Sequence, residues 1–430
     1  MTNTNNASEK NFILTKKKRW VMGKRVIILI MGVIILGVGG ILLFANPFTK
    51  KQQSTVQKPS NLAGITYPIV HTGVQKYYDS QKEVSTIKSG EAFFGQDANY
   101  LNNLPSYMDN KDGTIMDNVT ALMWEKDMGS KMTLEEANEK AKGSKLAGYS
   151  DWRVPTIKEL YSLSNFNGQD GGERAGDTFF IDTNYFRQPI GNKALGEREI
   201  DAQTWSSTVY TGKTMGNNET IFGFNFIDGR IKGYPKLSPP ELKEPLKMYF
   251  RLVRGNSDYG KNKFNDNNDG TISDTATGLM WQKEDSKKGM DWGNALAYCE
   301  GLNLSKHDDW RLPSAKELQS IVDYSRSPQA TKSAAIDPLF STSEIEDPRG
   351  GVNYPFYWSA TTFSQNGQAV YVSFGEALGQ MFNQILDVHG AGAQRSDPKS
   401  GSEADYPKYH GPQGDEQRVY NYARCVRTIK

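Results

Sequence analysis

The longest apolar run of the chain lies near its start. Residues Val26–Phe44 read VIILIMGVIILGVGGILLF, which is 19 residues without a charge. As a helix this run is about 28 Å long, close to the hydrocarbon thickness of a bilayer. Seven lysines and arginines precede it and three lysines follow it up to residue 58. The heavier positive flank predicts an uncleaved single-pass anchor with a cytoplasmic N-terminus and the rest of the chain outside. One alternative is a cleaved signal peptide, for which Leu43-Phe44-Ala45 is a poor cleavage site. The other is a buried core helix, which is disfavoured because no polar face interrupts the apolar run.

After this run the pattern changes to short helical and strand periods. Thr133–Lys142 and Trp292–Leu302 fit amphipathic helices, the second with Trp292, Ala295, Leu296 and Cys299 at i, i+3, i+4 and i+7. A further helix is expected in IKELYSLSNF and again in AKELQSIVDY. The LMW triplets are expected to be buried strands that follow tight Asp-Gly turns. Two helices followed by short strands predict an α+β class.

The same pattern occurs twice. DNKDGTIMDNVTALMWEKD at Asp109–Asp127 matches DNNDGTISDTATGLMWQKED at Asp266–Asp285, and DWRVP at Asp151–Pro155 matches DWRLP at Asp309–Pro313. KEL follows each pentapeptide, and the copies close with RLVR and RCVR. One domain is therefore repeated in tandem over about 160 residues, which is too long a period for a solenoid.

These motifs resemble the Lcl C-terminal-domain family, a domain of long-unknown function in bacterial envelope proteins that is related to the C-type-lectin-like fold. The resemblance covers roughly residues 66–430, twice over. It implies two tandem C-type-lectin-like α+β domains behind one N-terminal transmembrane helix. Residues 61–108 match the lead-in region of relatives and are expected to pack against the first copy. The expected organisation is a basic cytoplasmic tail (1–25), a transmembrane helix (26–44), a linker (45–65), a first domain with its lead-in segment (66–256) and a second domain (257–430).

The chain has two cysteines, Cys299 and Cys425, and both belong to the second copy. When the copies are aligned they fall on Ala141 and Leu252. This joint replacement by apolar residues indicates a buried disulfide in one copy exchanged for an apolar contact in the other, and a helix-to-last-strand bridge is also a feature of the family. The alternatives are two free buried thiols, or a catalytic or metal-binding pair, which is disfavoured because nothing near either residue activates a thiolate.

The repeated pentapeptide is interpreted as structural. A Trp between charged neighbours in both copies indicates a core anchor, with the charged groups satisfying loop backbone. The alternative is a paired ligand site. The residues concerned are Asp151, Trp152, Arg153 and Pro155 in the first copy, and Asp309, Trp310, Arg311 and Pro313 in the second.

The copies differ most between the WS motif and the closing motif, where the second is 20 residues longer. The extra length falls in Asn383–Arg424, which is rich in Gly, Pro, Asp, Tyr and His and shows little periodicity. A long irregular loop of this kind is typical of binding, with a structural flap and a contact between domains or chains as the alternatives. The candidate ligand-binding residues are Asp387, His389, Gln394, Arg395, Asp397, Lys399, Tyr406, Tyr409, His410 and Asp415.

Charge and motifs narrow the function. Of 51 basic and 49 acidic residues, nine and one lie in residues 1–51, which leaves a net charge of −6 beyond them. That balance disfavours bulk binding of a polyanion and predicts no nucleic-acid partner. No catalytic motif is recognised, so no enzymatic activity, cofactor or metal is expected. The thiol chemistry of formylglycine-generating enzymes, whose fold is related, is disfavoured because both cysteines are interpreted as structural.

The sequence thus predicts a membrane-anchored, adhesin-like or receptor-like binding module of the cell envelope, with its domains in the periplasm or outside the cell. The expected partners are a glycan, a cell-wall fragment or an envelope protein, held by loops of the second domain, and the bilayer through residues 26–44. The alternative is a non-catalytic structural or assembly subunit of an envelope complex. An envelope enzyme is the third hypothesis.

Overall fold

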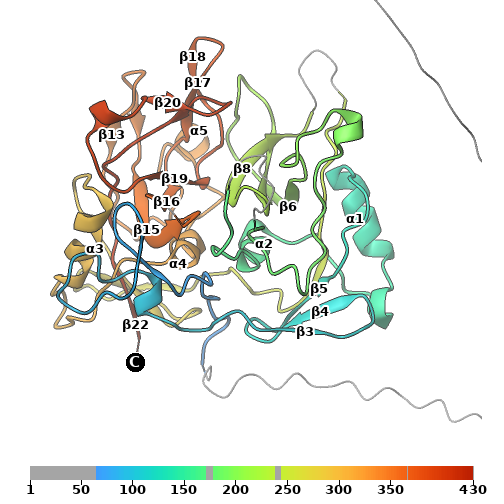
Figure 1. The fold of residues 1–430 in the computed structure, drawn as a ribbon, viewed down its shortest axis with the longest axis horizontal. Coiled ribbons are helices and arrows are strands. Elements are labelled where there is room, and N and C mark those ends of the chain that lie inside the picture. The colour runs from blue at the N-terminus through green and yellow to red at the C-terminus, as the bar shows by residue number, and fades with distance from the viewer. Residues whose placement is uncertain (1–63, 171–177, 238–243, 366, 430) are drawn as a thin grey trace, which may run out of the picture. The chain divides into compact units, whose positions relative to one another are not determined.

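The computed structural model describes residues 64–170, 178–237, 244–365 and 367–429 (Figure 1). The predicted transmembrane helix, residues 26–44, lies outside the described residues. Among the helices of the described ranges, none is long and apolar enough to cross a membrane.

Each copy begins with a four-stranded antiparallel sheet that its own closing motif completes. In the first copy the order is β3 (Tyr107–Asp109), β4 (Thr114–Asp117), β5 (Leu122–Glu125) and β9 (Val253–Gly255). In the second it is β10 (Phe264–Asp266), β11 (Thr271–Asp274), β12 (Leu279–Gln282) and β22 (Val426–Thr428). The predicted Asp-Gly turns are confirmed, since Gly113 and Gly270 both have φ of +89°, a value that favours glycine. The LMW strands lie in the core, with Trp124 and Trp281 fully buried.

The helices are short, and a side chain caps the N-terminus of each one. They are α1 (Leu134–Gly143), α2 (Ile157–Ser162), α3 (Trp292–Glu300), α4 (Ala315–Ser320) and α5 (Pro328–Thr331). Single 3₁₀ turns occur at Asp97–Asn99, Leu146–Gly148, Lys193–Leu195 and Glu403–Asp405. Capping boxes start α2 at Thr156 and α4 at Ser314, directly after the pentapeptide proline.

The predicted fold class, α+β domains of C-type-lectin-like type, is wrong: the described residues form mostly β-sheet with few helices. The helices expected in the two KEL segments end after six residues. There the hydroxyls of Ser162 and Ser320 donate to the carbonyls of Glu159 and Glu317 at 2.7 and 2.6 Å, an alternative to continuing the helix. The residues directly beyond form turns and, at Val322, an isolated antiparallel bridge to Ile336.

A six-stranded antiparallel sheet joins the two copies. Its order is β15 (Phe356–Phe363), β16 (Gln368–Ser373), β19 (Gln394–Pro398), β8 (Arg230–Pro235), β7 (Thr220–Asn225) and β6 (Thr204–Val209). In Figure 1 the orange strands of the second copy meet the green strands of the first at β19 and β8, which pair through Gln394 and Ile231. Since β6, β7 and β8 correspond to β15, β16 and β19, the order reads the same from both ends. The copies therefore dock like the subunits of a two-fold dimer.

The remaining strands are short and lie in three small sheets. One is specific to the second copy, with the order β18 (Gln384–Asp387), β17 (Leu378–Met381), β21 (Asp415–Glu416) and β20 (Tyr409–His410). The others pair β1 (Tyr77–Tyr78) with β2 (Glu83–Val84) and β13 (Ile345–Glu346) with β14 (Val352–Asn353).

The lysines of the two KEL motifs exchange hydrogen bonds across the junction. Lys158 Nζ in the first copy donates to Ser320 O at 2.6 Å, and Lys316 Nζ in the second donates to Ser162 O at 2.8 Å. These acceptors are the last residues of α4 and α2. Burial lowers the pKa of Lys158 to about 8 and that of Lys316 to about 7. The exchange is reciprocal, as in an isologous interface.

The sequence predicts that the lead-in segment packs against the first copy, but in the structure this segment contacts both copies. Thr72 O accepts from Phe166 N of the first copy at 2.8 Å, but the segment continues across the second copy (blue in Figure 1). There Thr361 Oγ1 donates to Asp97 Oδ2 at 2.8 Å. The segment contacts both copies because it passes along the junction at which they dock.

We expect Gly233→Ala to destabilise the junction. A Cβ at this position of β8 would lie 2.5 Å from Thr220 Cγ2 and 2.6 Å from His389 O, the acceptor of the Gly233 N–H. The overpacked contact is expected to lower the free energy of unfolding by about 1–3 kcal/mol in urea denaturation. Gly143→Ala is the matched control, because its Cβ would meet no atom within 4 Å and is expected to be neutral or slightly stabilising. Equal effects of the two substitutions would contradict the tight junction.

Candidate functional site

The pentapeptide forms a corner that ties the middle of each copy to its end. Asp309 Oδ1 accepts from Arg427 Nε at 2.6 Å, and Asp151 Oδ1 accepts from Arg254 Nε at 2.7 Å. Trp310 Nε1 donates to His307 O at 3.1 Å and Trp152 Nε1 to Leu146 O at 3.1 Å. Pro155 and Pro313 lie just before the helix caps. These contacts are internal to each copy.

The arginine of the corner forms an ion pair with the glutamate of KEL. In the second copy Arg311 Nη1 and Nη2 donate to Glu317 Oε2 and Oε1 at 2.7 and 2.6 Å, and the first copy pairs Arg153 with Glu159. Burial acts to raise the pKa of Glu317, but Arg311 and the cap at Ser314 outweigh it and hold that pKa below its usual value. The pair is therefore ionised and neutral overall.

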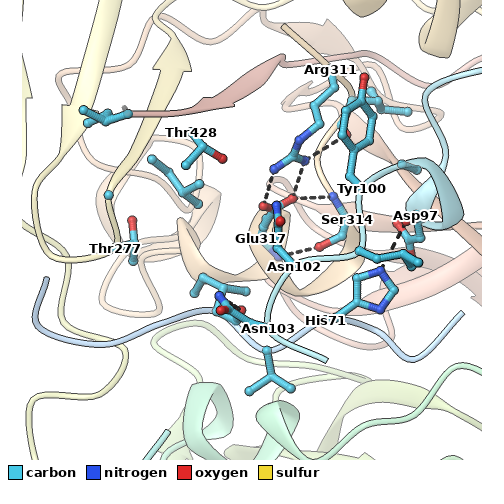
Figure 2. Close-up of a pocket in the computed structure, with 18 of the residues that line it drawn as sticks. His71, Asp97, Tyr100, Asn102, Asn103, Thr277, Arg311, Ser314, Glu317 and Thr428 are labelled. Atoms are coloured by element: carbon cyan, nitrogen blue, oxygen red, sulfur yellow. Dashed lines mark hydrogen bonds and ion pairs between the residues drawn. The ribbon is translucent and has the colours of Figure 1, made fainter. Parts of the chain in front are cut away.

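A cleft of about 460 Å³ opens beside the corner of the second copy (Figure 2). The lead-in segment forms one wall and the second copy forms the rest, with Thr277 and Thr428 on the side opposite Asp97 and Tyr100. The lining of this cleft is about equally apolar and polar. The lining residues are Ile65, Ile69, Val70, His71, Asp97, Tyr100, Leu101, Asn102, Asn103, Thr277, Gly278, Leu279, Arg311, Leu312, Ser314, Glu317, Ala360, Thr428 and Ile429.

The polar wall of this cleft contains a buried carboxyl with one unpaired oxygen. Asp97 Oδ2 accepts from the hydroxyls of Thr72 and Thr361, whereas Oδ1 has no hydrogen-bond partner. Burial raises the pKa of Asp97, against the influence of His71 and the two hydroxyls. His71 Nδ1 accepts from Gly73 N at 3.0 Å, so Nε2 carries the proton and donates to Asp97 O at 3.2 Å.

Sequence reasoning assigned no role to the lead-in residues of this cleft. His71, Asp97, Tyr100, Asn102 and Asn103 lie about 200 residues before Arg311 along the chain. A weak signal was present, because Tyr100 and Asn102 fall on Ser257 and Tyr259, directly before the second copy, when Asp109 is aligned with Asp266.

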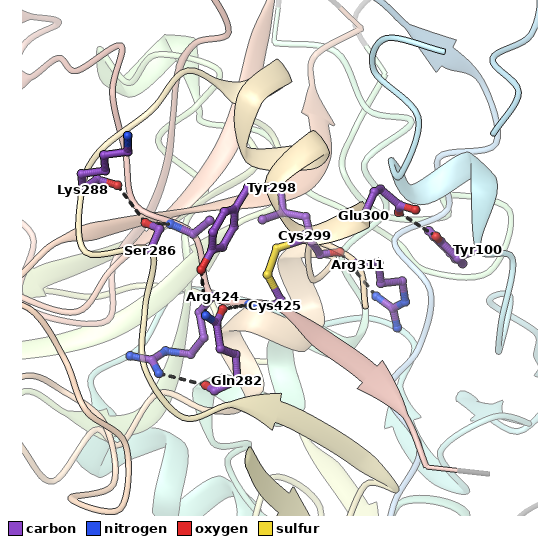
Figure 3. Close-up of a disulfide and its surroundings, with 12 residues drawn as sticks. Tyr100, Gln282, Ser286, Lys288, Tyr298, Cys299, Glu300, Arg311, Arg424 and Cys425 are labelled. Atoms are coloured by element: carbon purple, nitrogen blue, oxygen red, sulfur yellow. Dashed lines mark hydrogen bonds between the residues drawn. A yellow bond between two sulfur atoms is a disulfide. The ribbon is translucent and has the colours of Figure 1, made fainter. Parts of the chain in front are cut away.

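The predicted disulfide is confirmed. Cys299 of α3 is bonded to Cys425, next to β22, with 5.4 Å between the Cα atoms (Figure 3). Both residues are fully buried. In the first copy Ala141 and Leu252, at the corresponding positions, are both buried in one apolar cluster. The described residues contain no free cysteine.

The long segment of the second copy is not an irregular loop. It contains β18, β19, β20 and β21, and seven of the ten candidate residues on it are buried: Asp387, His389, Gln394, Arg395, Asp397, Lys399 and Asp415. Several of them face the first copy, with Tyr210 OH donating to Asp387 Oδ2 at 2.8 Å and Met215 N to Asp387 O at 2.8 Å. The placement agrees with the contact between domains that was one of the alternatives. Tyr406, Tyr409 and His410 are half-buried.

The buried candidates form an ionic cluster inside the junction. Asp415 accepts from His389 Nε2 at 2.8 Å and forms an ion pair with Arg395. Burial, followed by the charge of Arg395, lowers the pKa of His389 well below its ordinary value, and burial lowers that of His410 to about 4. Burial also raises the pKa of Asp397 to about 7. A ligand role for these ten residues stays a prediction.

In the described ranges the side chains that could bind a metal ion are dispersed. None of the His, Cys, Asp and Glu side chains there gather in groups of three or more that could hold a metal ion. In the Figure 2 cleft, the Ser314 hydroxyl accepts from Glu317 N at 3.3 Å as a helix cap.

The repeated corner, the paired closing strands and the twofold order of the sheet define a tandem-repeat domain protein. The model of the Lcl C-terminal domain matches residues 113–254 and 270–388, one segment in each copy. The chain therefore belongs to the Lcl C-terminal-domain family, and it carries two tandem copies of this envelope-associated domain, whose function is unknown. No curated protein matches the chain.

Proposed function

We propose that this chain is a non-catalytic binding module of the cell envelope that recognises a glycan, a cell-wall fragment or a protein. The observation that carries the proposal is the cleft of about 460 Å³ at the second corner, a volume typical of small-ligand sites. Its strongest charges neutralise each other in the Arg311–Glu317 pair. The buried disulfide supports a location outside the cytoplasm, where such bonds persist.

The lining of the cleft favours a neutral ligand with several hydroxyl or amide groups. Asn102 and Asn103 offer exposed amides, and Thr277 and Thr428 offer hydroxyls on the facing side. Leu101 and Ile429 supply exposed apolar surface beside them. A sugar unit or a short peptide presents the same mixture of polar groups and apolar faces. The binding site thus moves from the predicted loops of the second domain to the corner beside the lead-in segment.

Replacing Asn102 with tryptophan is expected to abolish binding at this cleft, because an exposed side chain at its mouth is exchanged for a ring that fills it. The measurement is isothermal titration of the purified chain with neutral probes: N-acetylglucosamine trimer, soluble muropeptides and short peptides from cell-wall stems. Leu104→Trp is the matched control, since residue 104 is exposed on the same segment but does not line the cleft. Loss of at least tenfold in affinity at this site is expected for N102W and less than twofold for L104W. An unchanged affinity and an unchanged number of sites in both variants would refute the cleft, and binding of no probe by the unmodified chain would refute the small-ligand function.

An assembly role is the second candidate, favoured by one exposed aromatic residue. Phe382, at the tip of the β17–β18 hairpin, is 83% exposed, and no such hairpin occurs among the described residues of the first copy. An aromatic side chain on a projecting turn suits a contact with a partner protein. Retention of an envelope partner by the chain but not by F382S, with probe binding absent, would favour this alternative.

A further inference from the structure

A second cavity, of about 540 Å³, lies at the corresponding corner of the first copy. Several of its lining residues correspond, in the internal repeat, to residues that line the Figure 2 cleft. Arg153, Thr156 and Glu159 occupy the positions of Arg311, Ser314 and Glu317. The arginine and the glutamate are again paired, so the corner is again neutral.

The outer wall is also related by the repeat. Residues 257–264, which lead into the second copy, take the place that the lead-in segment has at the Figure 2 cleft. With Asp109 aligned to Asp266, Ser257 and Tyr259 correspond to Tyr100 and Asn102, which line the Figure 2 cleft. Both corners therefore have a wall built from the segment that precedes a copy.

Residues of the other copy complete this second cavity. Asp323, Tyr324 and Asp337 of the second copy line it beside Phe264. The reciprocal bond from Lys158 to Ser320 O holds the end of α4, just before these residues, against the first copy. The cavity exists only while the copies are docked.

The side chains in this cavity suit a polyhydroxyl compound. The rings of Tyr324 and Phe264 offer flat apolar faces, and the carboxylates of Asp323 and Asp337 accept hydrogen bonds from hydroxyl groups. Ser207 and Thr208 also line the cavity. A sugar ring combines an apolar C–H face with peripheral hydroxyls and so matches both kinds of group.

We propose that the corner of the first copy is a second ligand site, and that the docked chain holds two neutral polyhydroxyl ligands, one at each corner. The inference rests on the proposed function of the Figure 2 cleft, of which this site is the counterpart. Two sites on one rigid unit would raise the avidity for a polymer that presents repeated sugar units.

The test is the number of sites measured by isothermal titration of the full chain with N-acetylglucosamine trimer and with soluble muropeptides. Ser257→Trp fills the mouth of the second cavity, because residue 257 is exposed and lines it. Asp258→Trp is the matched control, exposed at the next position but outside the lining. Thermal unfolding of each variant checks that the copies stay folded and docked.

Two sites are expected for the unmodified chain and for D258W, one for S257W, one for N102W and none for the double variant. The affinity of the remaining site is expected to change by less than twofold. A single site that only N102W removes would overturn this inference and leave the proposed function in place. Absence of binding by the unmodified chain would overturn both.

Discussion

Replacing both Cys299 and Cys425 with alanine is expected to lower the free energy of unfolding by about 4–5 kcal/mol, the value for a bridge that closes a loop of this length. The bond spans 126 residues and connects α3 to the closing segment, so its loss releases most of the second copy in the unfolded chain. Both residues are fully buried, which adds the cost of a cavity. Denaturation by guanidinium without reductant measures the effect.

The first copy supplies a sharper version of this experiment. Cys299→Ala with Cys425→Leu reproduces the pair that the first copy has at Ala141 and Leu252, both buried in its core. We expect this variant to be about 1–2 kcal/mol more stable than the double alanine variant, because leucine restores buried apolar area. Equal stability of the two variants would show that the repeat does not transfer packing between its copies.

Replacing Lys158 and Lys316 together with methionine is expected to lower the free energy of unfolding by about 3–5 kcal/mol. Each substitution leaves buried carbonyl oxygens without a donor, at about 1–3 kcal/mol for each unsatisfied group, and relief of the buried charge offsets part of that loss. Lys316 Nζ serves Ser162 O and His71 O, and Lys158 Nζ serves Ser320 O. Calorimetry should then resolve two transitions where the intact chain shows one, because the copies no longer unfold together. Lys142→Met is the control, since Lys142 is exposed and pairs only with Glu139 at the surface.

The same lysines give the stability a pH dependence with a defined sign. Burial lowers the pKa of Lys316 to about 7, with Asp117 and Asp97 acting in the opposite direction, whereas an unfolded lysine titrates near its ordinary value of about 10.4. Between pH 7 and 10 the unfolded chain therefore binds more protons, and this contribution to stability rises with pH. Lys316→Met removes that rise, so the difference between K316M and the unmodified chain should grow from pH 6.5 to pH 9.5. A difference that stays constant over this range would mean that Lys316 titrates normally in the folded chain.

Local features were predictable because their causes are local. The capping residues Thr156 and Ser314 follow a proline and precede a glutamate at the third helical position, and the glycines of the Asp-Gly turns need a positive φ. The disulfide was predictable because the repeat supplied a comparison: two cysteines in one copy stood against two apolar residues in the other. The α+β class failed because helical periodicity over ten residues does not show where a serine hydroxyl ends the helix.

The burial of the candidate ligand loop could not be predicted, for a different reason. A segment rich in Gly, Pro and charged residues is typical of solvent-exposed loops, yet Asp387 and His389 are buried and bonded to Tyr210 and Gly233 of the first copy. Nothing in the composition of Asn383–Arg424 indicates these contacts. The residues of the Figure 2 cleft were missed because the lead-in segment and the corner that it meets are separated by about 200 residues.

The amino-acid sequence alone was enough to establish the tandem repeat, the family, the buried tryptophans and the cysteine bridge. Each of these follows from a comparison of the two copies or from a short-range pattern. Only the tertiary structure revealed how the copies dock, through β8 and β19 and through the exchanged bonds of Lys158 and Lys316. A hydrophobic pattern shows that a face is buried but not which partner buries it. The two corner cavities depend on that partner, and therefore no local stretch of the chain encodes them.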